Sequence, residues 1–239
     1  MKRLHLLLCL LVLAVVAAVF SAHLRTCFMP WVRQYTLEER LRQIGGPARA
    51  RLKPHFVQAH VTYPPAQAVL LGLKQAKELQ VYALVGSNYQ YVCTYPILAA
   101  SGLPGPKLRE GDRQVPEGLY TINELNPNSV LHVGLHLSYP NDFDRQQAAL
   151  EGRTNLGEDI MIHGGAVSIG CLAMGTQASE DLFVLAADTG LTNLTVVLAP
   201  VDFRKGETVP KAVTLPKWSE QLYETVRQKM KELPLPPAP

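Results

Sequence analysis

The apolar residues of this chain fall into short runs separated by turns, which is the pattern of a β-rich domain. Runs rich in aliphatic, β-branched and aromatic residues at 68–74, 79–86 and 89–98 predict three successive strands joined as a meander. The other segments predicted as strand are residues 61–65, 120–122, 130–137 and 195–198, with Val213 as further strand material. We therefore expect a mainly β fold.

Helical signals flank this β-rich part. Thr36 and Glu39 form a capping-box pattern that predicts a helix start. Gly45 and Gly46 predict the end of that helix, and a second helix is expected after Pro47. Helical spacing also occurs at residues 179–187 and 217–232, and the proline-rich end of the chain should be extended.

The N-terminus carries an export signal. Lys2 and Arg3 precede residues 4–22, which are apolar and contain no charged residue apart from His5. A cleaved signal peptide and a retained membrane anchor both fit this pattern, and the length of the apolar run favours the anchor. In either case Lys2 and Arg3 stay on the cytoplasmic side, so the body is periplasmic or otherwise in the cell envelope.

Composition limits the classes of function. The chain has 239 residues, a hydrophobic fraction of 47%, a charged fraction of 18% and a net charge of +3. These values describe a globular protein and give no support to nucleic-acid binding. An exported compartment permits a disulfide between Cys27 and Cys93, although their spacing does not predict one.

Residues 157–175 contain the candidate chemistry. His163 and Cys171 lie eight positions apart between two apolar segments, and Asp159 to Ile162 read as a strand that enters the site. Gly164 and Gly165 end that strand, and a turn of small residues precedes Leu172. A cysteine with a histidine in the same fold is a nucleophile signature, but a buried cysteine that serves only packing is the alternative.

Two further readings concern ligands. A zinc site assembled from His132, His136, His163 and Cys171 is disfavoured because the ligand spacing is not tight, and no cofactor is implied. Residues 101–118 are rich in glycine and proline and form a long loop, which suggests function or disorder. Its Arg109 and Arg113, together with Arg153, are candidates for binding substrate carboxylates, with a solvated loop as the alternative.

Three ordered motifs carry a resemblance: GPKLREGDRQVPEGLY (105–120), SYPNDFD (138–144) and IHGGAVSIGC (162–171). The chain resembles the L,D-transpeptidase family with its YkuD-type catalytic domain, and within it the YafK-like branch of exported murein enzymes. The resemblance implies a β-sandwich or barrel with flanking helices, and peptidoglycan stem peptides as substrate. It covers the catalytic domain at 66–205, and the residue pattern outside it predicts a membrane anchor or signal peptide (1–30), a helical extension (31–65) and a C-terminal helix with a proline-rich tail (206–239).

The resemblance also assigns roles. Cys171 matches the nucleophile, His163 the base, Gly170 the glycine whose neighbouring amides would bind an oxyanion, and Ser168 the residue that opens the motif. Ile169 and Ala173 stand where the family usually has histidine and arginine, so the usual acceptor contacts are missing. Asp159 is too far along its strand to orient His163, which leaves a backbone carbonyl or a residue distant in sequence. Tyr139 and Asn141 either contact substrate or only shape a turn.

Three functions remain open. The first is transpeptidation, in which Cys171 forms a thioester, D-alanine leaves, and an amine of another stem peptide or of a protein accepts the acyl group. The second is a cysteine hydrolase that cuts peptidoglycan cross-links or peptidoglycan–protein links with the same two residues. The third is a non-catalytic wall-binding module.

Overall fold

The computed structural model describes residues 33–211 and 214–237 and divides the chain into two units, Met1–Tyr35 and Thr36–Pro239. The predicted apolar segment at 4–22, Cys27 and Val213 lie outside the described residues. Among the described residues no helix has both the length and the apolar character to cross a membrane. All helices and strands that the structure describes belong to the second unit.

Nine strands of the described part form one mixed sheet. They are β1 (Ala68–Leu73), β2 (Glu78–Val85), β3 (Asn88–Pro96), β4 (Ala99–Ala100), β5 (Gly118–Asn126), β6 (Gly134–Leu137), β7 (Met161–His163), β8 (Leu172–Ala173) and β9 (Leu194–Ala199). Their order is β3-β2-β1-β9-β5-β6-β7-β8-β4. The predicted meander is therefore confirmed as β1 to β3, whereas residues 61–65 are not a strand and β6 begins only at Gly134.

The sheet is curled, because its two edges belong to almost the same stretch of chain. β3 is at one end of the strand order and β4 is at the other, yet Pro96 and Ala99 are three residues apart. Three residues span at most about 10 Å, so the two edges must approach each other. The predicted mainly β architecture with flanking helices is confirmed in this form, as a single curled sheet in place of two stacked sheets.

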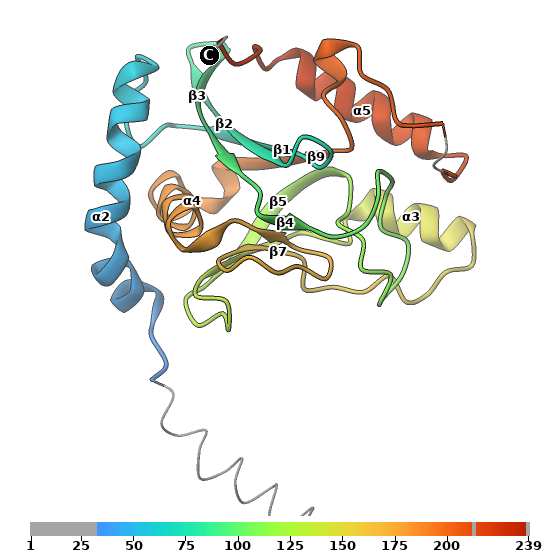
Figure 1. The fold of residues 1–239 in the computed structure, drawn as a ribbon, viewed down its shortest axis with the longest axis horizontal. Coiled ribbons are helices and arrows are strands. Elements are labelled where there is room, and N and C mark those ends of the chain that lie inside the picture. The colour runs from blue at the N-terminus through green and yellow to red at the C-terminus, as the bar shows by residue number, and fades with distance from the viewer. Residues whose placement is uncertain (1–32, 212–213, 238–239) are drawn as a thin grey trace, which may run out of the picture. The chain divides into compact units, whose positions relative to one another are not determined.

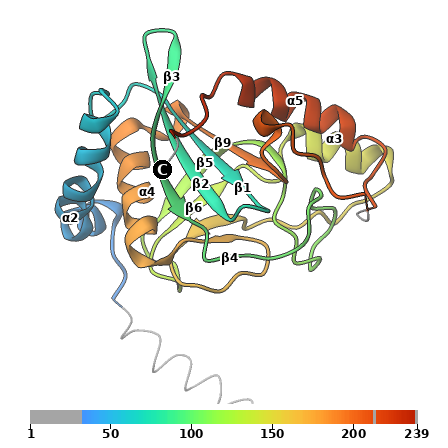
Figure 2. The same cartoon turned by 45° about the horizontal axis from the view of Figure 1, so that its top comes forward.

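β1 explains why helices cover both faces of the sheet. All six of its residues are buried, which is typical of a strand covered on both sides. Ala68 and Leu70 belong to one apolar core and Val69 and Leu71 to another, as the alternation of side chains requires. On the first side lies α4 (Gly175–Thr189) with α2 (Leu37–Gln58) packed against it, and on the second lies α5 (Ser219–Lys231) (Figures 1 and 2).

The N-terminal helical part differs from the prediction. The capping box of Thr36 and Glu39 is confirmed by two hydrogen bonds of 3.1 and 2.9 Å, but α2 runs without interruption through Gly45, Gly46 and Pro47. The predicted break was wrong because a continuous buried stripe of Ile44, Ala48, Leu52 and Phe56 repeats every four residues. Packing against α4 therefore outweighs the local preference of glycine and proline.

A short helix, two 3-10 turns and the C-terminal helix complete the described fold. α3 (Asp142–Leu150) was not predicted, although Asn141 and Asp144 form its capping box. α5 confirms the predicted C-terminal helix, and Val226 and Met230 bury its apolar face. Short 3-10 turns at Leu191–Asn193 and Phe203–Lys205 flank β9.

Candidate active site

β7 and β8 bring His163 and Cys171 together. The two strands are parallel neighbours, with His163 opposite Ala173 and Ile162 opposite Leu172. Cys171 directly precedes β8, and the N–H of Met161 donates to its Sγ at 3.4 Å. Cys171 therefore lies across from Met161, whose side chain shares a strand face with that of His163. The offset along the strand is two residues, or about 7 Å.

Three glycines shape the turn between the two strands. A side chain at Gly164 would collide with the carbonyl oxygen of Leu131, and Gly165 has a φ of 73°. Gly170, directly before Cys171, has a φ of 126°, which side chains rarely allow. The predicted role of Gly164 and Gly165 in ending the strand is therefore confirmed.

Ser168 closes this turn onto Cys171. Its Oγ accepts the N–H of Cys171 at 3.1 Å and that of Gly170 at 3.4 Å, and donates to the Cys171 carbonyl at 2.6 Å. In this structure the two amides expected to bind an oxyanion thus donate to Ser168. The hydroxyl fixes the conformation of the turn, and the oxyanion role of these amides stays a prediction.

The imidazole of His163 is buried and held by its own backbone. The side chain is 2% exposed, and its Nδ1 lies 2.5 Å from the carbonyl oxygen of Gly164. A carbonyl accepts only a proton donor, so Nδ1 carries the hydrogen and Nε2 is left as the basic nitrogen. Burial lowers the pKa of His163, and the Gly164 carbonyl opposes that shift. The ring is therefore neutral near pH 7 and can accept a proton.

The thiol of Cys171 is half-buried and sits between opposing influences. Burial raises its pKa, and the carboxylate of Asp159 adds to that, whereas the Met161 N–H and the Lys107 ammonium lower it. The S–H also donates to the Asp159 carbonyl at 3.5 Å. Cys171 is thus a thiol at rest that needs a base. Burial raises the pKa of the Cys93 thiol as well, to about 12.

The approach to β7 differs from the prediction. β7 begins at Met161, and Asp159 has a left-handed φ of 58° and so is not part of the strand. Its side chain is 78% exposed, and its carboxylate lies 3.8 Å from Nδ1 of His136. The carbonyl of Asp159, in contact with the thiol, is the part of this residue that belongs to the site.

The four residues considered for zinc have separate partners. His132 Nε2 lies 2.8 Å from Glu180 of α4, and His136 lies beside Asp159. Within the described ranges no group of three or more histidine, cysteine or acidic side chains is placed to hold a metal ion.

The predicted substrate-binding residues divide into two groups. Arg109 and Arg113 have exposed side chains on the long loop, whereas Arg153 bonds to Glu151 and to the Leu108 carbonyl at 2.7 Å each. Tyr139 donates to the Leu156 carbonyl at 3.1 Å. Asn141 caps α3 and donates to the Leu119 carbonyl, so both side chains have turn-forming contacts.

The long loop at 101–117 contains site residues that the sequence did not single out. Lys107 is 6% exposed and is held by Asp112 at 2.7 Å and by the Arg109 carbonyl at 2.8 Å. The carbonyl of Gln114 lies 3.7 Å from the position that a Cβ of Gly170 would take. Nothing in the sequence separates Lys107 from the neighbouring Arg109. Only the fold shows which cation acts on the thiol.

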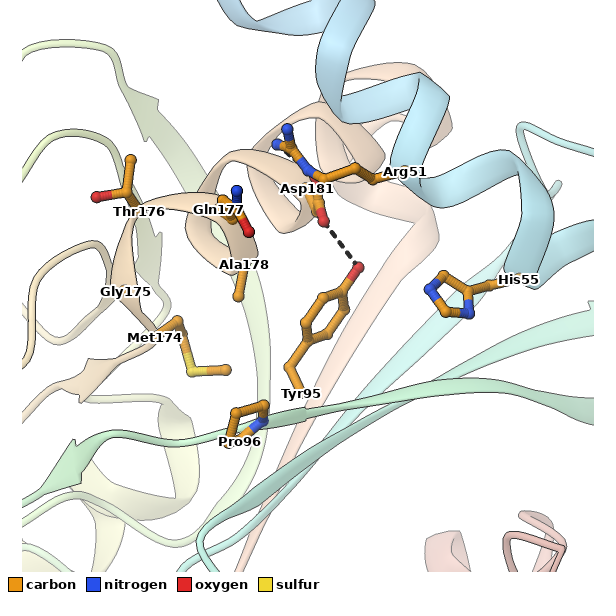
Figure 3. Close-up of a pocket in the computed structure, with 10 residues that line it drawn as sticks. All are labelled: Arg51, His55, Tyr95, Pro96, Met174, Gly175, Thr176, Gln177, Ala178 and Asp181. Carbon is orange, nitrogen blue, oxygen red and sulfur yellow. Dashed lines mark hydrogen bonds and ion pairs between the residues drawn. The ribbon is translucent and has the colours of Figure 1, made fainter. Parts of the chain in front are cut away.

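A cavity of about 620 Å³ opens beyond β8, between α2, the end of β3 and the start of α4 (Figure 3). The Tyr95 hydroxyl donates to Asp181 at 3.2 Å, and Arg51 pairs with the same carboxylate at 2.8 Å. His163 and Cys171 do not line this cavity. Its polar groups join α2 to α4 and are separate from the candidate chemistry.

Comparisons with known proteins agree with this geometry. The family model YkuD, the L,D-transpeptidase catalytic domain, matches residues 74–201, which is more than half of the chain. YafK of Escherichia coli (strain K12), a protein named among the L,D-transpeptidases, is 38% identical over 112 residues. That stretch covers 46% of this chain and 43% of YafK, so it spans less than half of the relative's length.

Two solved structures show more distant likeness. The helical cell shape determining protein Pgp2 from Campylobacter jejuni is 23% identical with a TM-score of 0.47, covering 60% of this chain and 49% of Pgp2. Bd1075 of Bdellovibrio bacteriovorus is 20% identical with a TM-score of 0.42, covering 71% and 56%. By its family match, the chain belongs to the L,D-transpeptidase catalytic-domain family, YkuD.

Proposed function

We propose that this chain is a peptidoglycan L,D-transpeptidase that works through a thioester on Cys171. One observation carries the proposal. The neutral, backbone-oriented imidazole of His163 and the thiol of Cys171 lie on the same face of adjacent strands. Burial raises the pKa of the Cys171 thiol, so the thiol needs a base to become a nucleophile, and a nearby imidazole can supply it.

The reaction has two steps. His163 Nε2 takes the thiol proton while Sγ attacks the carbonyl between a diaminopimelate-like residue and the terminal D-alanine. The C–N bond then breaks, the proton passes from His163 to the departing amine, and D-alanine leaves a thioester. In the second step an amine of another stem peptide attacks the thioester carbonyl, a C–N bond forms and the C–S bond breaks. The proton lost by the amine passes through His163 to the sulfur and restores the thiol.

The oxyanion of each step needs backbone donors. The N–H groups of Gly170 and Cys171 are the candidates, because they lie beside the attacking sulfur. Their present acceptor, Ser168 Oγ, holds them in one direction, and a substrate oxygen would take over one of these hydrogen bonds. Ser168 is thus part of the proposed catalytic set with Cys171, His163 and Gly170.

The substrate carboxylates require cations beside this set. The exposed Arg109 and Arg113 are proposed to bind them, with Arg153, Tyr139 and Asn141 at the border of the same region. A guanidinium offers two parallel donors to a carboxylate.

Hydrolysis is the second candidate, and two positions favour it. Ile169 is 81% exposed beside the nucleophile and Ala173 is fully buried, so neither supplies the polar contact that the family usually places there. Incubation of the purified protein with a tetrapeptide donor tests the choice. Cross-linked dimer with released D-alanine supports transpeptidation, whereas tripeptide and D-alanine without dimer at high acceptor concentration support the hydrolase.

The location of this activity is also a proposal. Lys2 and Arg3 ahead of the apolar run at 4–22 support an exported catalytic domain at 66–205, anchored to the inner membrane. A reporter fused after Pro239 should be active only outside the cytoplasm. Activity of that reporter in the cytoplasm would contradict both the proposed location and the proposed peptidoglycan substrate.

A further inference from the structure

A buried ion pair between Lys74 and Glu117 lies against the long loop at 101–117. Lys74 directly follows β1 and Glu117 directly precedes β5, and their side chains are 5% and 0% exposed. Nζ and Oε1 are 2.8 Å apart. A buried pair of charges gives little net stability, because desolvation opposes the attraction. Such a pair can instead serve to fix one conformation of the segments that it joins.

The two side chains of the pair form hydrogen bonds with both the loop and the C-terminal helix α5. Lys74 Nζ also donates to the carbonyls of Gly105 and Val115 at 3.0 and 2.8 Å. Glu117 Oε1 accepts the Gly105 N–H, and its Oε2 accepts the hydroxyl of Tyr223 at 2.7 Å. Tyr223 belongs to α5, which lies outside the residues matched by the family model.

The same loop touches the turn that carries the nucleophile. Ser101 Oγ lies 3.4 Å from Ser168 Oγ, and the Gln114 carbonyl packs against Gly170. Just before the loop, β4 pairs with β8, the strand that Cys171 precedes. A shift of the loop would therefore change the surroundings of Cys171.

We propose that Glu117 and Tyr223 are positioning residues: through the buried contacts with Lys74, α5 holds the loop at 101–117 in register with the turn of Cys171. The proposal rests on the proposed function for its meaning in catalysis. It makes the C-terminal helix part of the active-site support.

The pKa of the Cys171 thiol depends on the position of the loop. Lys107 is fixed within it, and its ammonium lowers the pKa of the Cys171 thiol. The other groups that act on this thiol are the Asp159 carboxylate and the Met161 N–H, both outside the loop, with His163 on the adjacent strand. Burial is the largest influence on the thiol pKa, and the loop packs against the turn of Cys171. If the loop moves, both the burial and the Lys107 contribution change, so the thiol pKa shifts.

Tyr223→Phe tests the link with the smallest change, because it removes only the hydroxyl that Glu117 accepts. Tyr82→Phe is the matched control: Tyr82 is also buried, and its hydroxyl bonds to Gln80 and Arg204, away from the loop. Each variant is compared with the wild-type chain for melting temperature, for the pH dependence of Cys171 alkylation by iodoacetamide, and for D-alanine release.

Tyr223→Phe should shift the alkylation midpoint away from the wild-type value and lower kcat/KM for D-alanine release about tenfold, within the cost of slight misplacement of a catalytic group. Glu117→Gln should do the same, and Tyr82→Phe should do neither. An unchanged alkylation midpoint in both Tyr223→Phe and Glu117→Gln would overturn the proposal. The alkylation experiment needs no peptidoglycan, so a wild-type chain without D-alanine release would count against the proposed function alone.

Discussion

His163 Nδ1 lies 2.5 Å from the carbonyl oxygen of Gly164, the residue that follows it. The group that orients the base is therefore part of the backbone, and the orientation depends on the path of the chain through Gly164 and Gly165. Side-chain substitution cannot remove this acceptor. It can be displaced only by bending the turn.

Gly164→Ala should bend that turn. Its Cβ would meet the Leu131 carbonyl, so the backbone must shift, at a cost of about 1–3 kcal/mol in the free energy of unfolding. Gly86→Ala is the control: it has open space and costs only about 1–2 kcal/mol for its left-handed backbone, in the turn between β2 and β3 and away from the site. Urea denaturation should show a similar loss of stability in both variants. D-alanine release should be lost in Gly164→Ala alone. Equal turnover in the two variants would contradict the proposed orientation of His163.

The activity should have an acidic limb set by His163. Burial lowers its pKa below the ordinary 6.5, and only the neutral ring accepts the thiol proton. As the pH falls, kcat/KM for D-alanine release should therefore drop only below 6.5. Folding stability should fall in the same direction, because the unfolded histidine binds its proton at a higher pH than the folded one. A His136→Gln variant should keep this limb, and a limb above 6.5 in the wild type would argue against His163 as the base.

Ser168→Ala should damage the turn before the nucleophile. The change leaves the N–H groups of Gly170 and Cys171 without their acceptor, which costs about 1–3 kcal/mol for buried groups. Ser168→Thr keeps the hydroxyl and serves as its control. We expect thermal denaturation to separate the two variants and kcat to fall in the alanine variant. If both variants keep wild-type kcat, Ser168 has no part in the chemistry.

Asp144 should make stability depend on pH near 6. Burial raises its pKa to about 6, against the hydrogen bonds from the Asn141 N–H and the Tyr120 hydroxyl and the charges of Arg145 and Arg153. The folded form therefore binds the proton more tightly than the unfolded form, so this contribution is full below pH 3.8 and is lost as the pH rises through about 6. Asp144→Asn should remove that part of the pH dependence of the melting temperature. An identical profile in the variant would show that another group is responsible.

The sequence predicted the local parts of the site better than its supports. The pairing of His163 with Cys171 and the glycine turn follow from residues within one short segment, so motif and spacing reveal them. The Lys74–Glu117–Tyr223 contacts join residues far apart in the chain, and no local pattern marks them.

The errors in secondary structure have two origins. Gly45, Gly46 and Pro47 predict a helix end, but Arg49 and Arg51 pair with Asp188 and Asp181 of α4 and hold α2 straight across them. α3 was missed because Asn141 and Asp144 read as turn residues, although the spacing of three is also that of a capping box. Long-range packing decided the first case, whereas the second depended on a local signal.

The proposed thioester chemistry depends on Cys171, and intact-protein mass measurement after exposure to a carbapenem tests it directly. The wild-type chain should gain the mass of one carbapenem, since a strained acyl donor traps the acyl-enzyme. Cys93→Ser should gain it as well, because the Cys93 thiol is buried with a pKa of about 12. Cys171→Ser should gain nothing, because its hydroxyl is a far weaker nucleophile at neutral pH. An adduct of the same mass on the Cys171→Ser chain, or a wild-type thiol that never reacts, would contradict the assignment of Cys171 as the nucleophile.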